Sequence, residues 1–144
     1  MNQAPAVLDV DSEANTMSVS FVAGEAYELG IRGHRVLVDQ PVADGGEDTA
    51  PTPTELFVAS LAACVAFYAG RYLTRHGYSR DGLAVSAAFD MATDRPARVT
   101  AIRIDVTVPE EVPAGRRPAL AAVISHCTVH NTLHATPEVS IGLR

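Results

Sequence analysis

The sequence predicts an α+β protein, and two observations carry that prediction. Short segments in which apolar and polar residues alternate occur on both sides of one long apolar segment, and such alternation is typical of half-buried strands. The long segment begins at Pro53 and continues through Gly70, with apolar residues on nearly every face, so we expect a helix buried on most of its sides. The resulting order of elements, βββ-α-ββ-α-β, favours antiparallel sheets.

Three short strands are predicted before the helix. Residues 16–23 alternate, with Val19 and Phe21 on one side and serines on the other, which indicates a half-buried strand. The segments 26–31 and 35–38 are also typical of strands. Turns that contain glycine, at Gly24-Glu25 and at Arg32-Gly33-His34, separate the three segments.

The start of the helix carries a strong local signal. Thr52 is placed to act as the N-cap, Pro53 occupies the first helical position, and Glu55 is the third residue. This arrangement fits a capping box with proline at its preferred place. Basic residues collect near the other end, where the helix dipole favours cations, and we expect Gly77 to end the helix.

After the helix, alternation returns in residues 83–91 and 99–108, which we expect to form a long hairpin. A second helix is predicted to run from near Pro118 to at least His126, with a cysteine at or just past its end. A proline then breaks any continuation, and residues 139–143 are predicted to form a last strand.

Composition limits the class of protein. The chain has 144 residues, which suits a single domain spanning residues 1–144, with residues 1–14 as a loose arm. The net charge of −6 argues against nucleic-acid binding, which requires a basic surface. The first residues do not resemble a secretory signal, and the apolar run from Leu56 to Gly70 is too short to cross a bilayer. We therefore expect a soluble cytoplasmic protein that binds neither nucleic acid nor membranes.

The two cysteines, Cys64 and Cys127, are the candidate chemical groups. In a reducing compartment a structural disulfide is disfavoured. Either both cysteines are inert residues of the core, or they form a catalytic or sensing pair. Their separation in the sequence does not decide between these alternatives.

Two motifs around the cysteines resemble a known family. Residues 53–64 read Pro-Thr-Glu-Leu-Phe-Val-Ala-Ser-Leu-Ala-Ala-Cys, and residues 126–133 read His-Cys-Thr-Val-His-Asn-Thr-Leu. In this order they resemble the two cysteine motifs of the OsmC-like, or organic hydroperoxide resistance, family, in a divergent branch. The resemblance implies an OsmC-like fold in which antiparallel sheets wrap long central helices of an intertwined homodimer, with both cysteines of one subunit at a site in the interface.

The resemblance also implies an activity. Cys64 would attack an organic hydroperoxide to give a sulfenic acid, and Cys127 would resolve it as a disulfide. A dithiol reductant, of the lipoyl type or similar, would then restore the thiols, with no cofactor. The protein would thus be a cysteine-based peroxidase of oxidative-stress defence. The alternative is an OsmC-like protein without enzymatic activity, which binds an apolar small molecule or senses redox state.

Two further catalytic residues follow from the same resemblance. Arg32 is the first match for the arginine that would favour the thiolate, and Arg35 is the second. Glu55 is the match for the family's glutamate, but that glutamate directly follows the motif proline, where this chain has Thr54. One residue along a helix turns a side chain by about 100°, so Glu55 need not point in the family's direction.

Four residues near Cys64 on the helix are candidates to line a substrate pocket: Phe57, Leu61, Phe67 and Tyr68. Plain packing in the core would explain them equally well. His126, His130 and His134 are spaced four apart, as ligands on one helical face would be, but no acidic ligand is near. We therefore predict no metal site, and note that His126 or His130 could stabilise a Cys127 thiolate.

Overall fold

The structure, a computed structural model, describes residues 15–144 and confirms the α+β class. The arm predicted for residues 1–14 lies outside the described residues. Contacts divide the chain into two units, of which the first ends at Leu56 and the second begins at Phe57. Each unit is described by itself.

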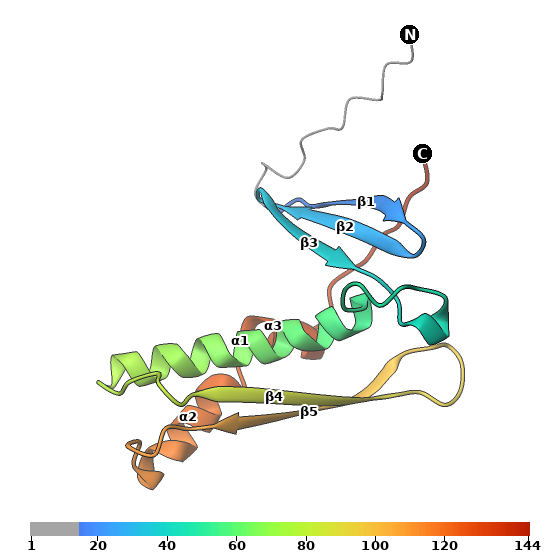
Figure 1. Cartoon of the computed structure of the whole chain (residues 1–144). Coiled ribbons are helices and arrows are strands. Elements are labelled where there is room, and N and C mark those ends of the chain that lie inside the picture. The colour runs from blue at the N-terminus through green and yellow to red at the C-terminus, as the bar shows by residue number, and fades with distance from the viewer. Residues whose placement is uncertain (1–14) are drawn as a thin grey trace. The chain divides into compact units, whose positions relative to one another are not determined.

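The first unit contains a three-stranded antiparallel sheet in the order β1-β2-β3 (Figure 1). The strands are β1 (Ser18–Ala23), β2 (Ala26–Ile31) and β3 (His34–Val38), close to the predicted segments. Between β2 and β3, Arg32 and Gly33 have positive φ angles of 49° and 82°. Two successive residues with positive φ form the tight two-residue turn that matches the twist of the strands on either side.

One face of this sheet is apolar, and most of it is exposed. The register places Val19 opposite Leu29 and Tyr27 opposite Val38, so these side chains share a face. Val38 is buried, but Val19 and Phe21 remain 61% and 64% exposed. The prediction that residues 16–23 are half-buried is therefore wrong for the single chain. The physical reason is that only the part of the face around Val38 is covered.

A loop after β3 is organised by one buried carboxylate. Asp39 is 2% exposed and accepts hydrogen bonds from the backbone N–H groups of Gln40 and Thr49 and from the Thr49 hydroxyl, at 2.8, 3.0 and 2.7 Å. The hydrogen bonds from Thr49 and Gln40 lower the pKa of Asp39 to about 2. This carboxylate therefore ties the two ends of the loop together just before the long helix.

The long helix is α1 (Pro53–Arg75), and its predicted capping box is confirmed. The backbone N–H of Glu55 donates to the Thr52 hydroxyl at 3.1 Å, and the N–H of Thr52 donates to the Glu55 carboxylate at 3.4 Å. Gly77 follows the helix with a φ of 78°, and the N–H of Tyr78 closes the last turn. The predicted start and stop signals thus act as expected.

With 23 residues, α1 is longer than the apolar run from Leu56 to Gly70, which is too short to cross a bilayer. By length and composition alone it could cross a membrane, so the expectation that this segment is too short to do so is wrong. The core helix of a soluble protein passes the same test. Leu61, Val65, Ala69 and Leu73, spaced along one side of α1, are buried inside the chain as such a core helix requires.

The second unit places α1 alongside a long hairpin of β4 (Ala84–Met91) and β5 (Val99–Thr107), as Figure 1 shows. The hairpin confirms the prediction. Its register pairs Val85 with Val106 and Phe89 with Ile102, so one face is apolar. That face contributes Val85, Ile102, Ile104 and Val106 to the core around α1.

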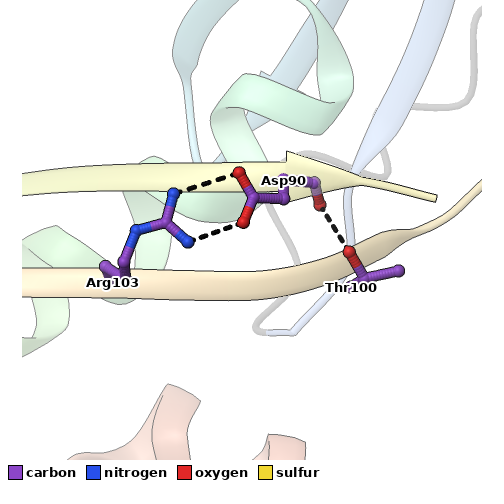
Figure 2. Close-up of polar contacts among 3 residues, drawn as sticks. All are labelled: Asp90, Thr100 and Arg103. Atoms are coloured by element: carbon purple, nitrogen blue, oxygen red, sulfur yellow. Dashed lines mark hydrogen bonds and ion pairs between the residues drawn. The ribbon is translucent and has the colours of Figure 1, made fainter. Parts of the chain in front are cut away.

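The other face of the hairpin is polar. Figure 2 shows Asp90 of β4 accepting two hydrogen bonds from the guanidinium of Arg103 on β5, at 2.6 and 3.1 Å. The Thr100 hydroxyl donates to the Asp90 backbone carbonyl at 3.2 Å. The pairing with Arg103 lowers the pKa of Asp90, and both side chains are exposed. An exposed pair of this kind fixes the register more than it stabilises the fold.

The end of the chain differs from the prediction. The second helix is α2 (Arg117–Ile124), shorter than predicted, and a third helix, α3 (Thr128–His134), follows it. Residues 139–143 form no strand, and Val139, Ile141 and Leu143 are 75%, 91% and 101% exposed. The last predicted strand is therefore wrong, because within the described chain no neighbouring strand pairs with this segment.

Helix α1 also differs from the prediction in one respect. Its side chains are buried mainly along the side that faces the hairpin and α2, whereas Phe57 and Phe67 are 43% and 53% exposed. The expectation that α1 is buried on most sides is therefore not met by one chain, because a single hairpin covers one side of a helix.

Candidate functional site

The two cysteines meet in one apolar cluster of the second unit. Cys64 is on α1, in the middle of the helix, and Cys127 immediately precedes α3. Leu61, Val65 and Cys127 form the buried centre of this cluster, and Cys64 packs against it together with apolar residues of β4, β5 and the two short helices. The structure thus brings together two residues that are far apart in the sequence.

Cys127 is the buried member of the pair. It is 0% exposed and caps the start of α3, where the N–H of His130 donates to its sulfur at 3.4 Å. Burial raises the pKa of the Cys127 thiol; the His130 N–H acts in the opposite direction, and the neighbouring Cys64 side chain adds to the rise. We therefore expect Cys127 to be a protonated thiol at neutral pH.

Cys64 is the accessible member of the pair, because it is only partly buried. Its position on α1 lies at the edge between the buried side, which includes Leu61 and Val65, and the exposed side, which includes Phe67. Both cysteines are free thiols in this structure. A small molecule can therefore reach Cys64 more readily than Cys127.

A hydrogen bond ties the two cysteine-bearing segments together. The hydroxyls of Tyr68, one helical turn after Cys64, and Thr128, next to Cys127, lie 3.0 Å apart. Tyr68 also packs in the cysteine cluster. The sequence indicated Tyr68 only as a pocket residue, and it gave no signal for Thr128 beyond its place in the second motif.

The other residues predicted to line a pocket have different surroundings. Phe57 and Leu61 line a cavity of about 310 Å³, together with Ile102, Leu133 and two histidines. Phe67 is exposed and packs edge-on against Tyr68, with ring centroids 5.5 Å apart. Leu61 and Tyr68 therefore lie in the cysteine cluster, whereas Phe57 and Phe67 lie at its margins.

A second cavity, of about 180 Å³, is lined by Val65, Ile104, Val106, Ile124, Ser125 and His130. His130 lines both cavities, although the sequence indicated it only as a possible metal ligand or partner of Cys127. Neither cysteine lines either cavity. The cavities therefore offer apolar space beside the cysteine cluster rather than at the sulfur atoms themselves.

Arg32 and Glu55 belong to the first unit, and the cysteines belong to the second. Arg32 is an exposed residue of the turn between β2 and β3, and Glu55 forms the capping box with Thr52. Arg35 on β3 lies 3.7 Å from the carboxylate of Glu28. Their predicted roles toward Cys64 stay predictions.

The three histidines do not share one helical face. His126 lies in the turn before Cys127, where its Nδ1 contacts the carbonyl of Ala122 at 3.0 Å. His130 and His134 are on α3, with their Nε2 atoms 3.0 Å apart. The His130 Nδ1–H donates to the carbonyl of Ser125, since a carbonyl can only accept. Among the described residues, no group of three or more potential ligands could hold a metal ion.

The chain resembles solved structures over most of its length. A structure from Psychrobacter arcticus, of an osmotic stress induced and detoxification response protein, has a TM-score of 0.75 and 22% identity over 83% of this chain and 88% of that chain. A Vibrio cholerae OsmC-like protein of unknown function has a TM-score of 0.64 and 11% identity over 81% and 91%. A Legionella pneumophila organic hydroperoxide resistance protein OsmC has a TM-score of 0.55 and 18% identity over 84% and 91%.

These likenesses show that the fold is shared. No curated protein matches the chain. A model of the family described as OsmC-like protein matches residues 45–142, which include both cysteines and the helices that carry them. This chain therefore belongs to the OsmC-like protein family.

Proposed function

We propose that this protein is a thiol-dependent peroxidase that reduces organic hydroperoxides in oxidative-stress defence. One observation carries the proposal: a partly exposed cysteine, Cys64, interacts with a buried cysteine, Cys127, inside an apolar cluster. An accessible sulfur suits attack on a peroxide, and a shielded neighbour suits resolution of the product.

The covalent steps involve only these two residues, the hydroperoxide and an external dithiol. The Cys64 thiolate attacks one oxygen of the hydroperoxide, the O–O bond breaks, and the other oxygen leaves as an alcohol after taking a proton. Cys64 is then a sulfenic acid. The Cys127 sulfur attacks the Cys64 sulfur, a disulfide forms, and the hydroxyl leaves as water. A dithiol reductant, of the lipoyl type or similar, returns both thiols by exchange and is itself oxidised to a disulfide.

The surroundings favour an organic substrate over hydrogen peroxide. The cavity beside Leu61 and Phe57 and the smaller one beside Val65 are lined mainly by apolar side chains. Such space is suited to the hydrocarbon part of an organic hydroperoxide. The structural neighbour from Legionella pneumophila is named an organic hydroperoxide resistance protein, which supports the same substrate class.

We propose Arg32, rather than Arg35, as the arginine that favours the Cys64 thiolate. Arg35 lies close to the Glu28 carboxylate, whereas Arg32 has no ion pair within residues 15–144. We propose Glu55 as the match for the family's catalytic glutamate, although its capping hydrogen bonds with Thr52 are enough to explain a glutamate at this position. A guanidinium can both stabilise a thiolate and donate hydrogen bonds to a peroxide.

We further propose that the protein acts as a homodimer in the cytoplasm. Large apolar side chains remain exposed on both units, including Phe21, Val19, Phe57 and Phe67. Exposed apolar surface of this extent is typical of a surface that a partner covers. A second copy of the chain would cover it symmetrically, as in most soluble oligomers.

The test is turnover of an organic hydroperoxide, such as cumene hydroperoxide, by the purified protein with dihydrolipoamide. We expect turnover in the parent, none in Cys64→Ser, and a sulfenic acid without a disulfide in Cys127→Ser. Arg32→Gln should lower turnover more than Arg35→Gln, which makes the same change of charge in the same hairpin. Free thiols in the parent after excess peroxide would contradict the proposal.

The alternative function is that of a binder or redox sensor without turnover. The observation in its favour is that neither cysteine lines the two apolar cavities beside them. In that case an apolar probe should bind equally well to the parent and to Cys64→Ser. The cysteines would then form a disulfide slowly or not at all, with no consumption of the dithiol beyond one equivalent.

A further inference from the structure

A group of basic side chains surrounds a cavity at the C-terminal end of α1. The cavity has a volume of about 250 Å³ and is lined by Tyr68, Arg71, Tyr72, Arg75, His76 and Val123. The whole chain has a net charge of −6, so this concentration of positive charge is unusual for it. All of these residues belong to the second unit.

Neighbouring side chains contact two of the basic groups, Arg71 and His76. The guanidinium of Arg71 lies over the ring of Phe67, 5.5 Å from its centroid. Arg116 donates to Nδ1 of His76 at 3.1 Å, because a guanidinium can only donate. The proton of a neutral His76 is then on Nε2. Two of the basic residues that border the cavity, Arg71 and His76, therefore each have a neighbour that restricts their position.

No carboxylate among the described residues pairs with these guanidinium groups, although Arg116 contacts His76. Among the described residues, the ion pairs of arginine involve Arg35, Arg98 and Arg103, and none involves Arg71, Arg75 or Arg116. The hydroxyl of Tyr72 is buried, and no hydrogen bond of acceptable geometry satisfies it within residues 15–144. Such a buried hydroxyl is costly without a partner.

The helix dipole explains only part of this arrangement. Cations near a helix C-terminus are favourable, which accounts for Arg75 and His76. The dipole does not account for a cavity beside Arg75 and His76. Nor does it account for Arg116, which comes from the segment before α2 and approaches the Tyr72 hydroxyl. A group of donors from two segments around an open space is what an anion site requires.

We propose that this cavity binds a small organic oxyanion, a carboxylate or a phosphate ester carried on an apolar body. The guanidinium groups of Arg71 and Arg75 match the paired oxygens of either anion. Tyr68, Tyr72 and Val123 provide apolar surface for the rest of the ligand. The proposal uses no cysteine, so it stands independently of the peroxidase function.

The test is calorimetric titration of the reduced, full-length protein with benzoate, phenyl phosphate and neutral benzamide. We expect at least one of the two anions to bind and benzamide to bind at least about tenfold more weakly. Tighter binding of phenyl phosphate assigns the site to phosphate esters, and tighter binding of benzoate assigns it to carboxylates. Binding of neither anion, or equal binding of benzamide, would overturn the proposal.

Matched variants locate the site. Arg75→Gln should weaken binding about tenfold, the loss expected for one charged hydrogen bond. Arg98→Gln removes the same charge from the exposed turn of the hairpin and should leave the affinity unchanged. Equal losses in the two variants would mean that only the general charge of the protein attracts the anion, and would overturn the proposal.

Tyr72→Phe separates binding from folding. If the unpaired hydroxyl serves the ligand, its removal should lower the affinity about tenfold, while the melting temperature of the free protein stays the same or rises. A lower melting temperature with unchanged affinity would show that the hydroxyl serves the fold, and would remove Tyr72 from the proposed site.

Discussion

The hydroxyls of Tyr68 and Thr128 lie 3.0 Å apart and join the helix that carries Cys64 to the helix that begins after Cys127. Tyr68 is four residues after Cys64, and Thr128 follows Cys127 directly. One hydrogen bond between side chains therefore helps to hold the two sulfur-bearing segments in register. Disulfide formation needs such alignment, since the two sulfurs must approach within bonding distance.

Tyr68→Phe should slow the formation of the Cys64–Cys127 disulfide. The ring still packs in the cluster, so we expect a loss of stability of about 1 kcal/mol or less, as for one exposed hydrogen bond. The slower resolution should leave more Cys64 as sulfinic acid after excess peroxide. Mass spectrometry of the protein quenched at successive times measures both products. Tyr27→Phe, on the first sheet, is the control and should behave like the parent.

The two cysteines should differ in reactivity toward an alkylating agent. Cys127 is buried and burial raises the pKa of its thiol, whereas Cys64 is partly exposed. With limiting N-ethylmaleimide at pH 7, Cys64 should be labelled about tenfold faster or more. Peptide mapping measures the ratio, and preferential labelling of Cys127 in the folded protein would contradict the assignment of roles.

The same pKa shift predicts the direction of a stability change in alkali. A thiol whose pKa is raised by folding keeps its proton in the folded state when the unfolded chain has already lost it. The stability is therefore complete below the ordinary pKa of 9.0 and declines as the pH rises above it. Urea unfolding between pH 8 and about pH 10 measures the decline, and Cys127→Ala should reduce it.

Local signals in the sequence were sufficient to predict several helices and strands. Glycine turns delimit β2 and β3, and the Thr52 to Glu55 capping box starts α1 at the predicted residue. These signals work because they depend on backbone conformation and on bonds between near neighbours. The alternation of β4 and β5 was equally reliable, because a core next to them buries one of their faces.

Features that depend on distant partners were harder to predict. Helix α3 has only seven residues, and its cap is a cysteine, which is not a usual N-cap residue. Residues 139–143 alternate like a strand but have no paired neighbour within the described residues. The spacing of Cys64 and Cys127 could not predict that they lie close together. Only the resemblance of two motifs to a family predicted it.

Asp39→Asn should destabilise the loop that precedes α1. The carboxylate accepts three close hydrogen bonds, whereas an amide presents its own donors to some of the same N–H groups. The pKa of Asp39 is lowered from 3.8 to about 2, so its contribution is complete above about pH 4 and is lost as the pH falls toward 2. The parent and the variant should therefore differ in melting temperature at pH 6 and converge near pH 2.

A matched control exists for this change. Asp94→Asn alters an exposed carboxylate that pairs with Arg98 in the hairpin turn, and it should change the melting temperature little at any of these pH values. If Asp94→Asn and Asp39→Asn have equal effects, the buried position of Asp39 is not the cause of its influence.

Gly46→Ala should destabilise the same loop by about 2 kcal/mol or more, because the added methyl group has no room. A Cβ at position 46 would overlap the carbonyl oxygen of Gln40 and would lie 2.9 Å from a carboxylate oxygen of Asp39. Backbone and a firmly bonded carboxylate cannot move aside as the end of a flexible side chain can. Gly115→Ala makes the same change where no atom lies within 4 Å of the new methyl group, and it should stay within about 0.5 kcal/mol of the parent. Chemical denaturation of both variants measures the difference, and equal stabilities would mean that the loop around Asp39 adapts to the methyl group without cost.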